Sequence, residues 1–278
     1  MISFLSHAKI NLGLQVLNKR EDDYHNIQSC FVEIDLEDTL DFSQSSSFQL
    51  SVEGADIPVD KSNLISKAYR LIRSRAEKVQ TEFSIHLKKC IPIGGGLGGG
   101  SSNAAVTLNV LNQLWHLNLS AEELEVMGTE IGADVPFFIK GGIQLVEGIG
   151  DILSPVDPIP MKDLHFILVV PPIHISTSWA YRALNKTLQP DKSRPKFAPL
   201  SKPMNWELFD NDFERIIYET YPEIRETKVN LQKAGALYAG LSGSGSTVFG
   251  VFDNIQKAKS ILEQFDQYQT FLTSPVFR

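Results

Sequence analysis

The feature that most constrains the fold of this 278-residue chain is the glycine-rich stretch at 91–105, IPIGGGLGGGSSNAA. Its six glycines lie between positions 94 and 100 and are interrupted by Leu97 alone. An alternating apolar segment precedes the stretch at 83–87, and apolar residues at helical spacing follow it over 101–115. Flexible linkers, in contrast, are normally embedded in polar, unstructured sequence. The flanks therefore favour a strand–loop–helix unit whose bare backbone binds an anion at a helix N-terminus, and phosphate is the anion we expect.

Other known glycine motifs fit this stretch poorly. A Walker A loop requires a lysine after its last glycine, and none follows here. The dinucleotide fingerprint matches formally at Gly94, Gly96 and Gly99, but its strand is not near the start of the chain or in a run of βαβ units. A protein-kinase glycine loop would have valine where this chain has Ser101. Ser101, Ser102 and Asn103 are also candidate N-caps of the helix that follows.

The composition limits the partners of the protein. A net charge of −7 disfavours broad binding to nucleic acid or to an anionic membrane, although local amides and cations could still hold a small anion. Two cysteines are too few for a disulfide scaffold and suit a reducing cytosol. The longest apolar run, FILVVPPI, is too short to span a bilayer, and the first residues show no secretory signal. We therefore expect a cytoplasmic protein with no membrane or nucleic-acid partner.

Strand and helix patterns are mixed along the whole chain. Strands are predicted at 8–17, 30–42, 83–87, 142–148 and 165–170, on both sides of LSGSGS at 241–246, and in a short segment after the last helix. Helices are predicted at 63–79, 101–115, 120–131, 178–188, 212–220, 223–233 and 255–265. The helix at 120–131 is predicted to begin with a capping box, Ser120 to Glu123. Three prolines at 154–160 mark the expected domain boundary, and prolines from 190 to 203 indicate a long loop. The pattern predicts an α+β fold with domains at 1–155 and 156–278.

Five motifs in order carry a resemblance to a known family. They are AKINLGL at 8–14, DDYHNIQS at 22–29, PIGGGLGGGSSNAA at 92–105, GADVPFF at 132–138 and LSGSGSTVF at 241–249. The glycine motif resembles the phosphate-binding motif of the GHMP small-molecule kinases, and the five together resemble the branch that serves the non-mevalonate isoprenoid pathway. The resemblance implies a two-domain fold with an N-terminal domain like ribosomal protein S5 domain 2 and a ferredoxin-like C-terminal domain. It also implies ATP, Mg²⁺ and a small-molecule acceptor linked to cytidine diphosphate.

Two residues are implied as catalytic. Asp134 matches the family's carboxylate that takes the proton of the acceptor hydroxyl, and Lys9 matches the cation beside it. On the sequence alone, Asp134 before Pro136 would be a turn or N-cap residue, and Lys9 a solvated lysine at a strand edge. The resemblance reverses both interpretations.

The binding residues implied by the resemblance fall into two sets. Tyr24 and His25 are expected to bind the cytosine by stacking and base-edge hydrogen bonds, with Tyr181 as a second aromatic face. The remaining substrate-binding candidates are Asn11, Thr177, Gly243 and Ser244. The nucleotide-binding candidates are Pro92, Ile93, Gly94, Gly95, Gly96, Leu97, Gly98, Gly99, Gly100, Ser101, Ser102, Asn63 and Lys89, and Ser102 is also the candidate Mg²⁺ ligand.

Two rival functions stay open. Another GHMP kinase, of the homoserine or mevalonate type, would share the glycine motif, but its substrate has no base for Tyr24 and His25 to stack on. A catalytically silent nucleotide-binding module would not need both Lys9 and Asp134. The six histidines show no paired metal spacing, and no nucleophile elbow is present, so metallohydrolase and serine-hydrolase chemistry gain no support. We expect a monomer or a homodimer.

Overall fold

The computed structural model describes residues 1–76, 81–185 and 200–278, which form two compact units. The first unit comprises residues 1–8, 36–92 and 98–141, and the second comprises residues 9–35, 93–97 and 142–278. Strands β1 (Ile2–Lys19) and β2 (His25–Ser45) contribute residues to both units. The units are therefore interleaved in sequence, and the glycine stretch itself divides after Leu97.

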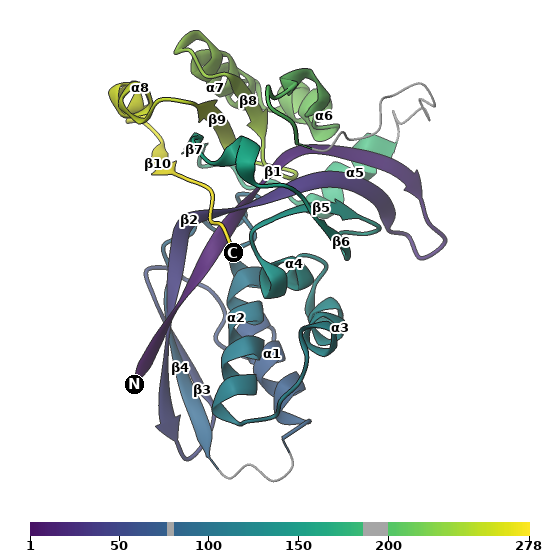
Figure 1. The fold of residues 1–278 in the computed structure, drawn as a ribbon, viewed down its shortest axis with the longest axis vertical. Coiled ribbons are helices and arrows are strands. Elements are labelled where there is room, and N and C mark those ends of the chain that lie inside the picture. Colours follow the sequence, from purple (N-terminus) through teal and green to yellow (C-terminus); the bar gives the residue numbers. More distant parts are fainter. Residues whose placement is uncertain (77–80, 186–199) are drawn as a thin grey trace. The chain divides into compact units, whose positions relative to one another are not determined.

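In the first unit, four helices lie beside a small sheet (Figure 1). Strand β4 (Glu82–Lys88) pairs with β3 (Gln49–Glu53) in parallel and with the end of β2 in antiparallel register, so that Leu87 lies opposite Leu40. The helices are α1 (Leu64–Arg73), α2 (Gly99–Leu114), α3 (Ala121–Ile131) and α4 (Val135–Lys140). Tyr69 joins them to the sheet, because its ring stacks on Phe48 and contacts Trp115 edge-on. Strand β3 and helix α4 were not predicted.

Side-chain N-caps fix the starts of helices α1 and α3. The predicted capping box of α3 is confirmed: Ser120 Oγ accepts from Glu123 N, and the Glu123 carboxylate accepts from Ser120 N at 2.8 Å. Asn63 caps α1 by accepting a hydrogen bond from Ile65 N at 2.9 Å. The predicted helix at 63–79 is shorter in the structure, since α1 ends at Arg73 and residues 77–79 lie outside the described residues.

The second unit contains a four-stranded antiparallel sheet in the order β10-β7-β9-β8 (Figure 1). Its strands are β7 (His165–Val170), β8 (Tyr238–Leu241), β9 (Val248–Phe252) and β10 (Gln269–Thr273). Its helices are α5 (Thr177–Asn185), α6 (Phe213–Thr220), α7 (Pro222–Lys233) and α8 (Ile255–Ser260). The β-α-β-β-α-β order along the chain and the strand order in the sheet confirm the expected ferredoxin-like arrangement. Ile217, Ile224 and Leu231 bury the helices against Val248 and Phe252 of the sheet.

The same unit contains two further strands beside β2. Strand β5 (Ile143–Glu147) pairs with β2, and β6 (Ile152–Pro155) pairs with β5. Short 3₁₀ helices follow at Ile159–Met161, Trp206–Leu208 and Leu262–Phe265. Strand β6 reaches into the proline-rich segment at 154–160, which shows no strand periodicity in the sequence. It is short and ends on Pro155, a residue that sheets accept at edges.

Two predicted segments differ in the structure or extend beyond its described part. The expected helix at 255–265 is divided, because α8 ends at Ser260 and a 3₁₀ turn follows. At the division Ile261 N bonds to Ala258 O, three residues back, which tightens the last turn. The expected helix at 178–188 begins with α5 at Thr177, while its residues 186–188 and most of the long proline loop lie outside the described residues.

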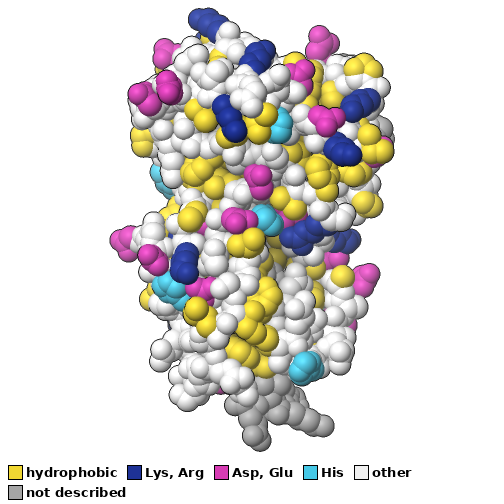
Figure 2. Space-filling model, turned by 60° about the vertical axis from the view of Figure 1, so that its left-hand side comes forward, with side chains coloured by type: hydrophobic (Ala, Val, Ile, Leu, Met, Phe, Trp, Pro, Cys, Tyr) yellow, Lys and Arg dark blue, Asp and Glu magenta, His cyan; other side chains and the backbone are white. Residues whose placement is uncertain are grey.

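Charged residues of both signs are interspersed over the face shown in Figure 2. Within the described part of the chain, no helix combines the length and the apolar character that crossing a bilayer requires.

Residues 275–278 bind to Glu33 and Ile34 of β2 within the second unit, and this set of contacts is here called the clasp. The carboxylate of Glu33, which is fully buried, accepts from Arg278 Nη2 at 2.6 Å and from Gly142 N at 2.6 Å. The Glu33 carbonyl accepts from Val276 N at 2.8 Å, and Ile34 forms a bridge with Pro275. A buried carboxylate requires such partners, because burial without them would strongly destabilise its charge.

Replacing Arg278 by Ala should therefore lower the free energy of unfolding by about 1–2 kcal/mol, since Arg278 is partly exposed and the loss of a buried pair is reduced by solvent. Urea denaturation of the full chain would measure the change. Arg278→Lys should keep part of the stabilisation, because lysine retains the positive charge. Arg225→Ala, at an exposed position, is the matched control. Equal unfolding midpoints for Arg278→Ala and Arg225→Ala would contradict the role of the clasp.

Candidate active site

Strand β1 carries a polar pair whose side chains are almost completely buried. Lys9 and Asn11 are 3% and 1% exposed, and Lys9 Nζ donates to Asn11 Oδ1 at 2.5 Å. The Lys9 ammonium also lies 4.5 Å from the centroid of the Phe31 ring, a cation–π contact. Asn11 Nδ2 donates to Ser29 Oγ at 3.2 Å. Lys9 is thus not the solvated strand-edge lysine that its sequence position alone would indicate.

The first half of the glycine stretch, residues 93–97, packs tightly within the second unit. Gly96 has φ +76°, and a Cβ atom there would lie 2.1 Å from the carbonyl oxygen of Ser242. Ser242 Oγ donates to Gly96 O at 2.9 Å, and Thr247 N donates to Gly95 O at 3.3 Å. Leu97 O accepts from Lys9 N at 3.0 Å. This half is therefore held by backbone contacts and is not a flexible linker.

The second half of the stretch begins helix α2 in the first unit. Gly98 is the N-cap residue, with φ +71° and no side-chain capping bond, so the helix starts earlier than expected. The predicted capping role of Ser101, Ser102 and Asn103 is therefore wrong, because all three lie inside the first turns of α2. A helix start without a side-chain cap leaves its first N–H groups for another acceptor, and the helix dipole favours an anion there.

Ser102 and Asn103 instead bond to the start of β1 within the first unit. The Oγ atoms of Ser6 and Ser102 are 2.8 Å apart, and Ser6 Oγ lies 2.7 Å from Asn103 Oδ1. All three residues are at most 2% exposed. This contact orients the first turn of α2 against β1.

Lys89, a candidate nucleotide contact, forms a buried ion pair in the structure. Its Nζ lies 2.8 Å from Asp38 Oδ2 and donates to Ile91 O at 2.5 Å. Asp38 Oδ1 accepts from Cys90 N and Ile91 N, each at 2.8 Å. Burial lowers the pKa of Lys89, while the Asp38 charge opposes that shift. A Cβ at Gly99 would lie 3.0 Å from Nζ, so this pair lies directly beside the start of α2.

Asp134 occupies the N-cap position of α4 in the first unit. Its side chain makes no capping bond to that helix, and the preceding turn is closed by Val135 N donating to Gly132 O at 3.0 Å. Gly128 allows α3 to approach α4 closely, because a Cβ there would lie 3.0 Å from Val135 Cγ1. The sequence position of an N-cap is thus confirmed, but the carboxylate does not serve as the cap.

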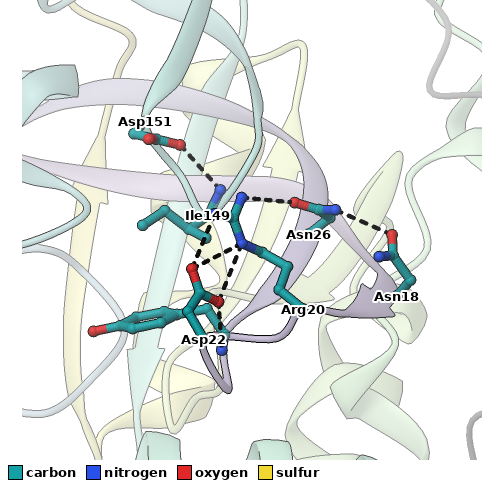
Figure 3. A network of polar contacts seen from close by, with 7 residues as sticks. Asn18, Arg20, Asp22, Asn26, Ile149 and Asp151 are labelled. Carbon is teal, nitrogen blue, oxygen red and sulfur yellow. Dashed lines mark hydrogen bonds and ion pairs between the residues drawn. The ribbon is translucent and has the colours of Figure 1, made fainter.

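The hairpin between β1 and β2 presents Tyr24 at the surface of the second unit. Arg20 Nε donates to both Asp22 oxygens, at 3.1 and 3.2 Å, and Asp22 Oδ1 accepts from Tyr24 N at 3.2 Å. The Arg20 side chain also reaches Asn26, as Figure 3 shows. The hydrogen bond from Arg20 lowers the pKa of Asp22. Tyr24 is 57% exposed, so the turn is ordered while the ring of Tyr24 remains accessible.

His25 and Tyr181, two of the candidate cytosine contacts, lie together in one aromatic cluster. Their ring centroids are 5.1 Å apart with an interplanar angle of 22°, and Tyr181 contacts Phe213 edge-on at 4.9 Å. Tyr181 packs against the core of the second unit and also stacks on His25.

The remaining substrate candidates lie near the loop between β8 and β9. Thr177 Oγ1 is 3.1 Å from Ser244 Oγ, and a Cβ at Gly243 would lie 3.3 Å from Asn11 Oδ1. The expected pair of strands around a Gly-Ser turn is confirmed, and the six residues between them exceed a tight hairpin.

The structure distributes the predicted residues between the units. The second unit holds Lys9, Asn11, Tyr24, His25, Ile93, Gly94, Gly95, Gly96, Leu97, Thr177, Tyr181, Gly243 and Ser244. The first holds Asn63, Lys89, Pro92, Gly98, Gly99, Gly100, Ser101, Ser102 and Asp134. Sequence reasoning missed Asp38 and Asn211, which do not stand out because each has acidic neighbours in the sequence, and it selected the motif that contains Ser242 but not Ser242 itself. Among residues 1–76, 81–185 and 200–278, no group of three His, Cys, Asp or Glu side chains could hold a metal ion.

Comparison with known proteins agrees with the motifs. Residues 63–142 match the GHMP kinases N terminal domain, and residues 193–269 match the GHMP kinases C terminal domain. The 4-diphosphocytidyl-2-C-methyl-D-erythritol kinase of Chlorobium luteolum is 40% identical over 99% of this chain and 98% of its own length. The enzyme of that name from Chlorobium phaeobacteroides is 39% identical over 99% of this chain and 96% of its own length.

Solved structures show the same fold. The crystal structure of a 4-(cytidine 5'-diphospho)-2C-methyl-D-erythritol kinase superposes with a TM-score of 0.80 at 28% identity, covering 99% of this chain and 100% of that one. The mevalonate kinase of L. major in complex with R-mevalonate has a TM-score of 0.68 at 14% identity, over 100% of this chain and 97% of that one, and supports the fold alone. With full-length relatives near 40% identity, this chain has the two-domain GHMP kinase fold and belongs to the GHMP kinase family, among the 4-diphosphocytidyl-2-C-methyl-D-erythritol kinases.

Proposed function

We propose that this protein transfers the γ-phosphoryl group of ATP to the 2-hydroxyl of 4-diphosphocytidyl-2-C-methyl-D-erythritol, in the non-mevalonate route to isoprenoid precursors. The observation that carries the proposal is the likeness to kinases of that name over 99% of this chain. It is supported by the aromatic residues at 24, 25 and 181, which a cytosine-bearing substrate would use and which homoserine or mevalonate would not. A monomer or homodimer in the cytoplasm remains our expectation.

In this proposal Asp134 accepts the proton of the acceptor hydroxyl, and Lys9 stabilises the charge that develops on the transferred group. Lys9 suits this role because its ammonium is oriented by Asn11 and Phe31 and is largely shielded from water. A low-dielectric environment strengthens its interaction with a phosphoryl oxygen. The polypeptide would supply position and charge, which are the main requirements of phosphoryl transfer.

The glycine stretch at 94–100 is proposed to hold the nucleotide phosphates. Its second half begins α2 without a side-chain cap, so backbone N–H groups and the helix dipole would bind the anion. Asn63 and Lys89 stay proposed as nucleotide contacts, although the buried pair with Asp38 gives Lys89 a supporting role as well. We also propose a boundary between the family's two domains at 155/156, which lies between the two family matches. It differs from the division into compact units, because the second unit also includes residues 9–35, 93–97 and 142–155.

The donor set fits a Mg²⁺ ion held mainly by phosphate oxygens. Mg²⁺ in kinases is commonly bound by one or two protein oxygens, with phosphate and water as its other ligands. Ser102 offers a hydroxyl oxygen in the first turn of α2, and that oxygen is already oriented by Ser6. The ion would neutralise charge on the phosphates of ATP.

Turnover assays with three acceptors test the proposal directly. ATP should be consumed with 4-diphosphocytidyl-2-C-methyl-D-erythritol and not with homoserine or mevalonate. Turnover with homoserine or mevalonate alone would indicate the rival GHMP kinases. ATP binding without turnover on any of the three would indicate a silent nucleotide-binding module.

The replacement Asp134→Asn should reduce kcat by about 100- to 10,000-fold, because the amide cannot accept the hydroxyl proton. The affinity for ATP should stay nearly unchanged, since the substitution keeps the shape of the side chain. Steady-state kinetics and nucleotide titration would measure the two quantities. The exposed Asp253→Asn is the matched control, and a kcat equal to that of the control would refute the assignment of the base.

The replacement Tyr24→Ala should raise KM for the cytidyl substrate by about 5- to 150-fold, the equivalent of about 1–3 kcal/mol of base stacking. Because Tyr24 is exposed, its removal should leave folding intact, and KM for ATP should not change. Tyr24→Phe keeps the ring and should behave like the unmodified protein. A similar rise in both KM values would mean that Tyr24 acts on the fold and not on the base.

A further inference from the structure

Asn211 lies in the second unit between strand β1 and the loop of residues 241–247, here called the 241–247 loop. The side chain of Asn211 is 5% exposed. The backbone around it runs beside β1: Asn211 forms a parallel bridge with Leu14, whose N donates to Asp210 O at 2.8 Å and whose O accepts from Asp212 N at 2.9 Å. Asn211 therefore has a fixed backbone from which its amide can act.

The Asn211 amide holds two carbonyls of the loop. Nδ2 donates to Leu241 O at 2.8 Å and to Gly243 O at 2.9 Å, and Oδ1 accepts from Phe213 N at 3.0 Å. Both N–H groups of the amide and its oxygen are used in this way. The bond to Phe213 is a local turn that Asp or Ser could also make, whereas the two bonds to the loop need a donor with two hydrogens.

The two carbonyls flank Ser242, and Ser242 connects the loop to the candidate site. Ser242 Oγ accepts from Asn11 N at 3.3 Å and donates to Gly96 O at 2.9 Å. Its backbone N donates to Thr247 O at 2.9 Å. A shift of Ser242 would therefore displace both the strand that carries Lys9 and the first half of the glycine stretch.

The residues after Asn211 strengthen the same connection. Asp212 Oδ2 accepts from Val16 N on β1 at 2.7 Å, and Glu214 Oε1 accepts from Leu241 N at 3.1 Å. Glu214 is itself paired with Lys228 at 2.6 Å. The tetrapeptide Asn211–Glu214 thus bonds to β1 on one side and to the 241–247 loop on the other.

We propose that Asn211 is a positioning residue that sets Ser242, and through it Gly96 and Asn11, for binding of the nucleotide and the acceptor. This inference deepens the proposed function and rests on it for its kinetic consequences. In this inference Asn211 acts through the Leu241 and Gly243 carbonyls, which flank Ser242, and not by touching a reactant. Its effect on the reaction is therefore one of geometry, and small misplacements of binding groups can change rates by about 100-fold.

The test compares Asn211→Asp with Asn254→Asp. The first change keeps the bond to Phe213 but places carboxylate oxygens against the two loop carbonyls. The second makes the same chemical change at an exposed cap of α8, where oxygen acceptors suffice. We expect Asn211→Asp to reduce the affinity for a fluorescent ATP analogue about 10- to 100-fold and to accelerate amide hydrogen exchange at Ser242 and Thr247, with neither effect in Asn254→Asp.

A double-mutant cycle separates positioning from general stability. Ser242→Ala removes the bond to Gly96 O while Asn211 is intact, so it also tests the idea if Asn211→Asp fails to fold. If Asn211 acts through Ser242, the double variant should lose little more affinity than the stronger single variant. The inference would be overturned if the affinity losses of the two single variants multiplied in the double variant. It would also be overturned if amide hydrogen exchange became faster evenly over the second unit.

The experiment distinguishes failure of this inference from failure of the proposed function. Amide exchange and nucleotide-analogue affinity do not depend on the identity of the acceptor. If the unmodified protein phosphorylates no cytidyl substrate, the proposed function fails, while the exchange and affinity data still decide the role of Asn211. If the unmodified protein is active and Asn211→Asp matches Asn254→Asp in every measurement, the inference alone is wrong.

Discussion

The close approach of Gly96 to Ser242 is the constraint on which much of the second unit depends. A side chain at position 96 would place its Cβ atom 2.1 Å from a carbonyl oxygen, so glycine is required there for space as well as for its positive φ. The contact joins two segments that are 146 residues apart in the sequence. Within the second unit, hydrogen bonds thus join residues 93–97, strand β1 from Lys9 onward, and the loop between β8 and β9. The glycine-rich residues 94–96 therefore have a defined backbone path.

The two halves of the glycine stretch have different roles, and both roles depend on the absence of glycine side chains. At the glycines 94–96 the absence of side chains allows backbone packing, whereas at 98–100 it leaves the start of α2 without a side-chain cap. A linker would gain nothing from either property. The buried Lys89–Asp38 pair supports the second half, because Asp38 also accepts two backbone N–H groups just before the stretch. Buried polar groups therefore hold both ends of the stretch: Lys89 and Asp38 before it, and Ser102 and Asn103 after it. These contacts reduce the conformational freedom that six glycines would otherwise have.

The local patterns of the sequence predicted much of the fold. The capping box at Ser120 and the alternation in β4 depend on neighbours a few residues away, so they are visible in the sequence. The start of α2 was misplaced because serines are good caps in general, while here the left-handed Gly98 begins the helix and Ser102 bonds to Ser6. Strand β6 was missed because its pairing with β5, and not its own pattern, defines it.

The candidate site shows the same division between local and distant information. Lys9, Asp134 and the glycine stretch were selected through motifs, as were His25 and, with a weaker match, Tyr181, whose rings stack on each other in the structure. Asp38 and Asn211 could not be found, because their partners Lys89, Leu241 and Gly243 are at least 30 residues away in sequence. Such residues make no motif with their neighbours, and their hydrogen bonds appear only when the chain is folded.

An acidic protein that binds a highly anionic substrate must rely on local groups, because its overall charge of −7 repels the ligand. In this chain the proposed contacts include uncapped backbone N–H groups, the oriented amide of Asn11 and two shielded lysines, Lys9 and Lys89. Backbone dipoles and a buried cation keep their geometry without rearrangement, whereas exposed lysines would be screened by salt within about 10 Å. Precise placement by buried hydrogen bonds therefore replaces a broad basic surface, and residues such as Asn211 matter because placement has to compensate for the unfavourable net charge.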